Sequence, residues 1–388
     1  MVKRIPNCIP VIEGNELQYV SDAIETAFIA SGPYVDKFEN FISNYCDVKN
    51  SISTNTGTSA LHIALILAGV KEGDAVILPN FTYAASANAV KYCNADLVFV
   101  DVSLDDWCMC PKSLNEFIEK YCIKKNGNVY IKKSNKKIAA IMPVHLYGQP
   151  VKLDEIKEIS DIYNIPLVED GAEALGAKYK DSSIGSGAFL CTLSFNGNKI
   201  ITGGQGGMIL TNNDKLAERA RLLIAQARKN RNEFEHEEVG FNYKMPNLNA
   251  AFALAQAENL DKYIENKRNI RNLYAKYLNS IEGLKIKDEM TDTKSTYWMS
   301  ILTVNEKIFK NGIMPLRKHL ENNLIEARPV WQPLSWQKAY RDSLNLKSPN
   351  SESIYNNSIC LPCSVNLQNA DIKKISQVII DFCESYSI

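Results

Sequence analysis

Between residues 50 and 210, short apolar runs of β-strand character alternate with segments of helical periodicity. Strands and helices alternate in this way when each strand is joined to a neighbouring parallel strand by a crossover helix. The pattern therefore predicts an α/β fold built on a mostly parallel sheet with helices against it. The predicted strands span 75–78, 96–101, 138–144, 166–169, 189–194 and 207–210, and the predicted helices span 59–68, 84–93 and 153–163.

Beyond Asn242 the pattern changes to long helical stretches rich in Leu, Ala, Glu and Lys. Helices are predicted at 249–267 continuing through 271–278, at 314–322 and at 370–386, with a strand at 296–304. This mixture indicates a smaller α+β lobe. Because 388 residues are more than twice the usual domain length of roughly 150 residues, we predict a large domain at residues 1–245 and a small C-terminal domain at residues 246–388.

The charge of the chain is balanced, with 44 basic and 44 acidic residues. Neither nucleic acid nor a membrane surface is therefore a predicted partner. The longest nearly apolar run, residues 60–70, is shorter than the ~20 residues that a membrane span needs. The residues after Met1 also lack the apolar core of a secretion signal, so we expect a cytoplasmic protein. The Lys- and Asn-rich stretch at 118–137 is expected to be a solvated excursion on the surface.

Ten cysteines make up under 3% of the chain and are expected to be reduced thiols. Cys360 and Cys363 have thioredoxin spacing, but no strand-to-helix pattern surrounds them and no second pair completes a zinc site. Cys108 and Cys110 are too close together for a usual zinc pair. We therefore expect ordinary thiols and no metal site.

Two segments place polar groups where a phosphorylated ligand can be held. Gly57, Thr58 and Ser59 open an apolar helix, so two hydroxyls accompany the unpaired amide groups of a helix N-terminus. Thr and Ser are also ordinary N-cap residues, which is the alternative interpretation. Asp170 ends an apolar strand, and the carboxyl end of a parallel strand opens onto the ligand crevice, although such an Asp can equally cap a helix.

A lone lysine, Lys199, lies between an apolar strand and a loop with four glycines in the five positions 203–207. Glycine lets the backbone pass close to a flat ligand. Apolar or uncharged neighbours favour the neutral amine, which is the form that makes an imine with a carbonyl group. A solvated surface lysine is the alternative, but it leaves the glycines unexplained.

Together these three features are the set that pyridoxal 5′-phosphate requires. The acid keeps the pyridine nitrogen protonated, the lysine holds the cofactor as an imine, and the helix start holds its phosphate. A dinucleotide site would need Gly-x-Gly-x-x-Gly and a P-loop would need Gly-Lys-Ser/Thr, and the sequence has neither.

Four segments resemble the motifs of the DegT/DnrJ/EryC1/StrS family of sugar-nucleotide aminotransferases: Asn55–His62, Pro143–Gly148, Glu169–Gly176 and Ser194–Thr202. The match runs in order from about residue 10 to residue 380. It implies the aspartate aminotransferase fold (fold type I) and a homodimer with active sites at the subunit interface. It also implies that the amino group of L-glutamate is transferred to a keto sugar on a nucleotide diphosphate.

Position by position, the resemblance implies that Lys199 carries pyridoxal 5′-phosphate and that Asp170 pairs with its pyridine nitrogen. Glu173 stands beside the cofactor hydroxyl, where many members have glutamine or histidine. The other implied contacts are Thr58, Ser59 and Ser194 with the phosphate, Tyr83 stacked on the ring, and Asn242 with the phosphate of the neighbouring subunit.

Finer motifs resemble the branch that aminates C4 of 4-keto-6-deoxy-N-acetylglucosamine nucleotides, for legionaminic acid and N-acetylbacillosamine: Ser194–Thr202, Ala225–Arg228, Glu235–Tyr243, Ala327–Trp331 and Leu361–Asn366. Perosamine synthases, which act on GDP-4-keto-6-deoxymannose, share much of this pattern and are the alternative. The candidates for substrate contact are His236, Arg328 and Trp331, and each of them can instead be an interface residue.

Three other classes of function use the same fold: sugar dehydratases, sensors or binding modules, and lyases. The related sugar 3-dehydratases carry histidine at the lysine position, so Lys199 argues against dehydration. A sensor or binding module that kept the cofactor fold stays open, as does another fold-type-I enzyme such as a cysteine or threonine lyase.

Overall fold

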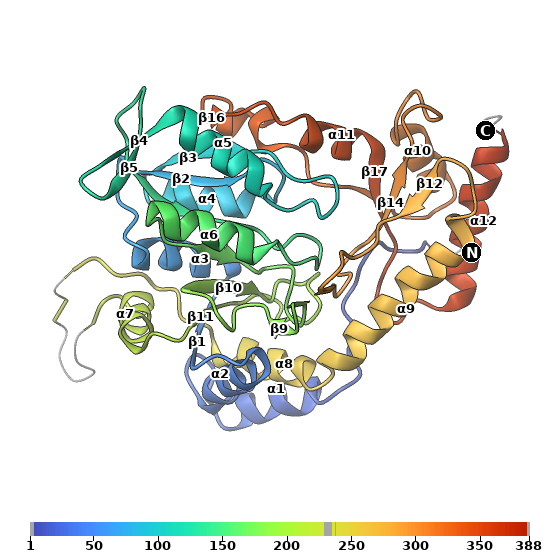
Figure 1. Cartoon of the computed structure of the whole chain (residues 1–388). Coiled ribbons are helices and arrows are strands. Elements are labelled where there is room, and N and C mark those ends of the chain that lie inside the picture. Colours follow the sequence, from blue (N-terminus) through green and yellow to red (C-terminus); the bar gives the residue numbers. More distant parts are fainter. Residues whose placement is uncertain (1–3, 229–234, 237, 386–388) are drawn as a thin grey trace.

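The computed structural model describes residues 4–228, 235–236 and 238–385, and a mixed sheet lies at the centre of its larger part (Figure 1). Two four-stranded sheets are joined through parallel bridges, Ile141 with Leu167 and Val144 with Asp170. Of the eight strands only β11 runs opposite to the other seven, so the predicted mostly parallel sheet is confirmed. The order across the sheet is β16 (Leu344–Asn345), β3 (Asp96–Val100), β2 (Ala75–Pro79), β6 (Ile138–Ile141), β7 (Val168–Asp170), β10 (Leu190–Ser194), β11 (Gly207–Thr211) and β1 (Asn50–Thr54).

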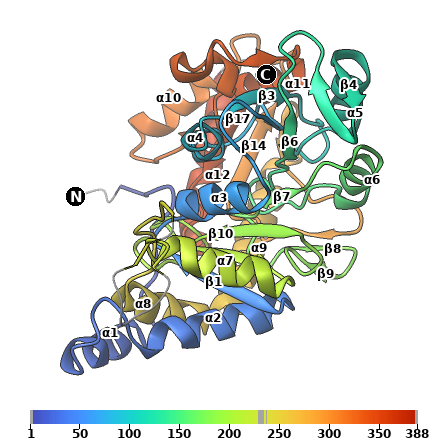
Figure 2. The ribbon, with the colours of Figure 1, turned by 90° about the vertical axis from the view of Figure 1, so that its left-hand side faces the viewer.

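Helices cover both faces of this sheet (Figure 2). In β2, Ala75 and Ile77 belong to one hydrophobic core, Val76 and Leu78 belong to another, and all four are fully buried. Such continuous burial is typical of parallel strands, because their crossover helices pack on both sides. One face is covered by α3 (Gly57–Leu67), α4 (Ala84–Tyr92) and α7 (Asp214–Ile224), and the other by α2 (Pro33–Cys46), α5 (Pro111–Tyr121) and α6 (Leu153–Tyr163).

The C-terminal part has its own antiparallel sheet, in the order β12 (Leu284–Ile286), β14 (Ser300–Val304), β17 (Ser358–Leu361) and β15 (Arg328–Pro329). The long helix α9 (Leu260–Leu278) reaches this sheet from the side of the large one, as Figure 1 shows. The helices α10 (Met314–Asn322), α11 (Pro349–Asn357) and α12 (Asn369–Ser385) complete this part.

Two segments beyond residue 245 pack against the first part of the chain. Helix α8 (Asn247–Ala257) contacts α1 (Glu16–Glu25) and α2, and β16 pairs with β3. The predicted division into domains at residues 1–245 and 246–388 stays a prediction. The remaining elements are β4 (Cys122–Lys125), β5 (Asn128–Ile131), β8 (Lys178–Tyr179), β9 (Ser182–Ser183), β13 (Thr293–Lys294) and two short 3-10 helices at Leu334–Trp336 and Lys338–Tyr340. No helix in the described residues is both long and apolar enough to cross a membrane.

Several predicted spans differ from the observed ones. The strand predicted at 138–144 ends at Ile141, because Pro143 has no amide hydrogen to give to a neighbouring strand. The helix predicted from 249 to 278 is two helices, α8 and α9, separated at Glu258 and Asn259. The strand predicted at 296–304 begins only at Ser300. The last predicted helix is α12, and residue 386, its predicted end, lies outside the described residues.

The Lys- and Asn-rich stretch is exposed, as predicted, but it is more ordered than an excursion. Strands β4 and β5 form a hairpin, in which Cys122 pairs with Ile131. Asn126 and Gly127 connect them with φ angles of 50° and 76°. Asn-Gly is the favoured pair for a hairpin turn with two left-handed residues, so the signal was present in the sequence and was missed.

Candidate active site

A cavity of about 450 Å³ opens at the carboxyl ends of β7 and β10, beside the N-terminus of α3. Parallel α/β sheets place their ligands at this end of the strands. The cavity is lined by Thr56, Gly57, Thr58, Leu61, Thr82, Tyr83, Ala85, Ser86, Val144, Asp170, Ala172, Glu173, Ser194, Asn196, Asn198, Lys199, Gln205, Gly206, Trp298, Arg328 and Trp331. A larger hollow of about 950 Å³, lined by residues such as Asp154 and Lys157, has neither Asp170 nor Lys199 in its wall.

The start of α3 forms the end of the cavity that suits a phosphate. Thr56 caps the helix, and its Oγ1 accepts a hydrogen bond from the amide of Ser59 at 3.0 Å. The hydroxyl of Ser59 lies 2.8 Å from the same oxygen, so this side chain belongs to the cap and does not line the cavity. Thr58 and Ser194 do line it, at the positive end of the helix dipole.

The glycine loop is explained by the backbone that crosses it. A Cβ atom on Gly207 would lie 2.4 Å from the carbonyl oxygen of Thr56 and 2.6 Å from the amide nitrogen of Gly57. A Cβ on Gly57 would in turn lie 2.8 Å from Cβ of Ser194. From the sequence we predicted that these glycines make room for a flat ligand. At Gly207 the group that needs the room is the backbone of the turn at Thr56 and Gly57.

Asp170 is fixed at the end of β7 and is 3% exposed. Its Oδ2 accepts a hydrogen bond from Ser86 Oγ at 2.7 Å, and its Oδ1 accepts one from the amide of Ala172 at 3.1 Å. Both oxygens are thus held in place, and the carboxylate faces the cavity. The part played by Ser86 was not found from the sequence, because only the fold brings α4 against β7.

Lys199 extends into the same cavity from the loop after β10. Its Nζ lies 3.6 Å from Oε1 of Glu173 and 4.1 Å from the centre of the Trp298 ring. The other carboxylate oxygen of Glu173, Oε2, accepts a hydrogen bond from the amide of Tyr147 at 2.8 Å. Burial raises the pKa of Glu173, and the neighbouring positive charge of Lys199 works against that rise. Glu173, which departs from the resembled motif, is therefore the carboxylate next to the lysine amine.

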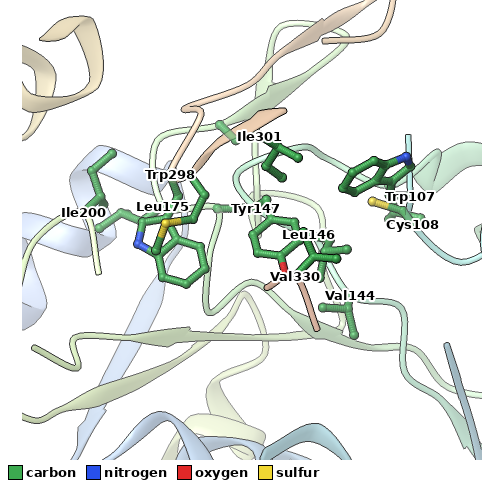
Figure 3. Packing of buried hydrophobic residues seen from close by; sticks show 14 of the residues in the cluster. Trp107, Cys108, Val144, Leu146, Tyr147, Leu175, Ile200, Trp298, Ile301 and Val330 are labelled. Atoms are coloured by element: carbon green, nitrogen blue, oxygen red, sulfur yellow. The ribbon is translucent and has the colours of Figure 1, made fainter. Parts of the chain in front are cut away.

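Trp298 and Trp331 line the cavity, and the buried ring of Tyr147 lies behind it between them. Tyr147 stacks between Trp298 and Trp331, with ring centres 6.0 Å and 5.7 Å away. Its hydroxyl accepts a hydrogen bond from the amide of Trp331 at 2.9 Å, and its backbone has a left-handed φ of 54°. Figure 3 shows Tyr147 beside Trp298 in this packing. A buried tyrosine with positive φ is strained, and strain of this kind is concentrated at functional sites.

The predicted substrate residues fall into two groups. Arg328 and Trp331 line the cavity, and Arg328 is also paired with Glu326 at 2.7 Å. His236 and Asn242 do not line it: Nδ1 of His236 lies 2.8 Å from the carbonyl oxygen of Gln226, and Asn242 forms a β-bridge with Ala225. Residue 237, within the quoted motif 235–243, lies outside the described residues.

The residues present fit pyridoxal 5′-phosphate. The cavity combines a helix N-terminus with hydroxyls for the phosphate, a fixed buried carboxylate for the ring nitrogen, and an amine between them. Tyr83, the predicted stacking residue, is 55% exposed and also lines the cavity. The fold and the site together define a pyridoxal-phosphate-dependent enzyme.

The chain belongs to the DegT/DnrJ/EryC1/StrS aminotransferase family, whose model matches residues 10–380. It is 37% identical over 383 residues to GDP-perosamine synthase of Escherichia coli O157:H7, covering 98% of this chain and 99% of the relative. It is 35% identical over 387 residues to EpsN of Bacillus subtilis (strain 168), named provisionally as a pyridoxal phosphate-dependent aminotransferase, covering 98% and 96%. Among solved structures, a family aminotransferase from Brucella abortus has a TM-score of 0.86 at 26% identity, covering 95% of both chains.

Family, fold and enzyme class are thus confirmed, and with them pyridoxal 5′-phosphate as the cofactor. The individual roles of the predicted site residues stay predictions, although the structure brings Thr58, Tyr83, Asp170, Glu173, Ser194 and Lys199 together around one cavity. Trp298, Tyr147 and Ser86 join them as residues that sequence reasoning did not single out.

Proposed function

We propose that the protein transfers the amino group of L-glutamate to C4 of a nucleotide-linked 4-keto-6-deoxy sugar. The observation that carries this proposal is the position of Lys199 Nζ, between Glu173 and the ring of Trp298 in a cavity that also holds Asp170. When bound, the cofactor supplies the carbonyl through which nitrogen is exchanged and the ring that takes up electron density.

The chain's own residues then handle the protons. Lys199 Nζ removes a proton from Cα of glutamate and later delivers one to C4 of the sugar. Glu173 keeps that amine oriented, since its second oxygen is fixed by the amide of Tyr147. The centre of the Trp298 ring lies 4.1 Å from the same amine, and the ring gives it an aromatic face to rest against. Asp170, held by Ser86, keeps the proton on the ring nitrogen.

The part of the cavity lined by Tyr83, Trp331 and Arg328 suits the sugar nucleotide. Trp331 presents its ring there, a flat apolar surface for a sugar. Tyr83 packs against Trp331 with ring centres 5.0 Å apart and presents an apolar surface to the sugar ring. Arg328 adds a guanidinium group for the diphosphate.

Two sugars are candidates. A 4-keto-6-deoxy-N-acetylhexose nucleotide, for a legionaminic acid or bacillosamine type of surface glycan, is supported by the motifs at Ala327–Trp331 and Leu361–Asn366. GDP-4-keto-6-deoxymannose is supported by the 37% identity to GDP-perosamine synthase. We propose the first as the substrate and the second as the alternative.

The active enzyme is proposed to be a homodimer with shared sites. Asn242 does not line the cavity of its own chain, where its carbonyl oxygen instead lies 3.4 Å from Nδ2 of Asn55. That position is compatible with a phosphate contact made across a subunit interface, as the family resemblance implies.

The test is turnover with L-glutamate against a panel of UDP- and GDP-linked 4-keto-6-deoxy sugars, followed by NMR of the product. We expect 2-oxoglutarate in excess over the enzyme only when one of these sugars is present, with the new nitrogen at C4, because without a sugar the exchange stops after the cofactor has taken up one nitrogen. If none of the sugars in the panel supports the formation of 2-oxoglutarate, the proposal is contradicted and a sensor is favoured. Release of pyruvate or ammonia from cysteine or threonine instead would favour a lyase.

A further inference from the structure

Lys267 of α9 is a buried cation whose polar neighbours are unusual. The side chain is 1% exposed, and its Nζ lies 3.0 Å from the carbonyl oxygen of Trp298, 3.5 Å from Sγ of Cys8 and 3.6 Å from Sγ of Cys363. In the described part of the chain no carboxylate lies within ion-pair distance of it. A buried ammonium group needs a negative partner, because moving a charged amine out of water without an opposite charge beside it is strongly unfavourable. The groups that can supply that charge are the two thiols.

The two sulfurs are held side by side by the backbone around them. The amide of Cys363 donates to the carbonyl oxygen of Asn7 at 2.7 Å, and the amide of Ile9 donates to Oγ of Ser364 at 3.0 Å. Residues on both sides of Cys8 are therefore tied to Cys363 and its neighbour. Both sulfurs also lie within 3.6 Å of a single nitrogen, Nζ of Lys267, so the two side chains end in the same small region of the core.

This environment makes Cys8 lose its thiol proton much more readily than Cys363 does. A hydrogen bond from Cys363 lowers the pKa of Cys8 to about 5 against the effect of burial, and the charge of Lys267 lowers it further. The pKa of Cys363 is raised by the same hydrogen bond and by burial. Burial alone raises the pKa of Cys46 to about 12, which is the usual result for a buried thiol.

We propose that Cys8 and Cys363 form a modification site that reacts with hydroperoxides to give a disulfide. This pair is not the one suggested by the spacing of Cys360 and Cys363, since the partner of Cys363 comes from the N-terminal segment. Cys8, a residue that is 9% exposed, supplies the thiolate sulfur as the nucleophile. All ten cysteines are free in the structure, so the pair is described in its reduced state.

The reaction balances in two steps. The thiolate of Cys8 attacks the terminal oxygen of the hydroperoxide, so an S–O bond forms, the O–O bond breaks, and the other oxygen leaves as water or an alcohol after taking up a proton. The sulfur of Cys363 then attacks the sulfur of Cys8, the S–S bond forms, the S–O bond breaks, and water leaves with the thiol proton. Two cysteines lose two electrons in total, and the peroxide gains them.

The site lies directly behind the active-site loop. Sγ of Cys8 is 3.7 Å from the carbonyl oxygen of Asn198, the residue before Lys199, and Lys267 holds the carbonyl of Trp298. Disulfide formation removes the negative charge that faces Lys267 and leaves the carbonyl as its remaining polar neighbour. The inference itself rests on the thiols and the lysine and is independent of the proposed substrate.

The first experiment treats the full-length protein, freed of reductant, with hydrogen peroxide, alkylates it and maps its peptides. We expect a linked peptide joining Cys8 to Cys363, a mass lower by two hydrogens, and reversal by dithiothreitol. In Cys363→Ser the reaction is expected to stop at a sulfenic acid on Cys8 that dimedone traps. The matched control is Cys46→Ser, because Cys46 is also buried, and it is expected to give the same linked peptide as the wild type.

A second measurement follows the ultraviolet absorbance of the thiolate against pH in the wild type and in Cys8→Ser. The wild type is expected to show a step near pH 5 that the variant lacks. Oxidation of other cysteines before Cys8, or a linked peptide that does not contain Cys363, would overturn the proposal. So would the absence of that step. The wild-type peptide map decides the matter if a variant does not fold.

Discussion

The carboxylate of Glu173 is buried beside the amine of Lys199, and its second oxygen accepts the amide of Tyr147. Its pKa is raised by burial, and the charge of Lys199 only partly offsets this. Between its ordinary pKa and the raised one, the folded protein holds a proton that the unfolded chain has lost. Raising the pH through this interval therefore destabilises the folded state.

The variant Glu173→Gln removes that titration. Its stability relative to the wild type is expected to rise as the pH increases from below the ordinary glutamate pKa to above the raised one, while its turnover falls because the lysine amine loses its negative partner. Urea unfolding at several pH values, together with turnover at each, measures both effects. A stability difference that does not change with pH would contradict the assignment.

Ser86 is the residue that fixes Asp170, through a 2.7 Å hydrogen bond to a buried carboxylate oxygen. Ser86→Ala is expected to cost about 1.5–3 kcal/mol of unfolding free energy, the usual contribution of a hydrogen bond to a charged group. Weaker binding of pyridoxal 5′-phosphate should accompany this loss, measurable by fluorescence titration.

A buried serine with no such partner serves as the control for this change. Ser376 is 2% exposed, and its hydroxyl has no hydrogen-bond partner among the described residues. Ser376→Ala should lose no stability, because it breaks no hydrogen bond and removes a buried unpaired hydroxyl, and it should bind the cofactor normally. Equal losses in the two variants would mean that Ser86 does not support Asp170.

Among elements, the contact between β11 and the turn before α3 is the tightest at the site. A Cβ at Gly207 would meet three backbone atoms of Thr56 and Gly57 at 2.4–2.6 Å, so Gly207→Ala must displace the phosphate-binding turn. We expect a loss of about 1–3 kcal/mol in stability from this overpacking. The affinity for pyridoxal 5′-phosphate should fall as well, since the helix start moves.

The matched control for that change is Gly187→Ala. No atom outside its immediate neighbours lies within 4 Å of a Cβ placed at Gly187, and its φ is not in the left-handed region. Thermal unfolding and cofactor titration should leave this variant within about 0.5 kcal/mol of the wild type. If Gly207→Ala behaves in the same way, the glycine is not required for the cradle.

The elements that sequence periodicity predicted well are those whose apolar pattern is local. Helices α6 and α10 have the predicted bounds, and β2, β3 and β11 lie within one residue of theirs. The hairpin of β4 and β5 was missed because charge was weighed above its Asn-Gly turn. Strands such as β15 and β16, each two residues long, carry no period of their own and exist through pairing with β17 and β3.

At the site, motifs identified the residues that adjoin the cavity along the chain, such as Asp170 and Lys199. They did not identify Trp298, which comes from the C-terminal part and meets Lys199 only after folding. Ser59 shows the opposite case, because its helix start was predicted but its hydroxyl is taken up by Thr56. The ligand contacts of a hydroxyl depend on competing hydrogen bonds that spacing does not reveal.

For the whole molecule, the shared active site proposed for a homodimer predicts complementation between two defective chains. Lys199→Ala and Asn242→Ala should each have low activity alone. When they are co-refolded in equal amounts, half of the dimers are hybrids with one intact site of two, so about a quarter of the wild-type activity should return. Analytical ultracentrifugation checks that dimers have formed. Activity that stays at the sum of the two variants would show that each chain completes its own site.

Lys199 is proposed to carry the cofactor and to move the protons of an amino transfer. The most direct measurement compares the wild type with Lys199→Ala for visible absorbance of bound cofactor and for release of 2-oxoglutarate from L-glutamate in the presence of a keto-sugar nucleotide. Our prediction is that the wild type has both, that the variant loses the covalent absorbance, and that its turnover falls by at least about 100-fold, as expected when a general acid–base is removed. Unchanged absorbance and turnover in Lys199→Ala would contradict it.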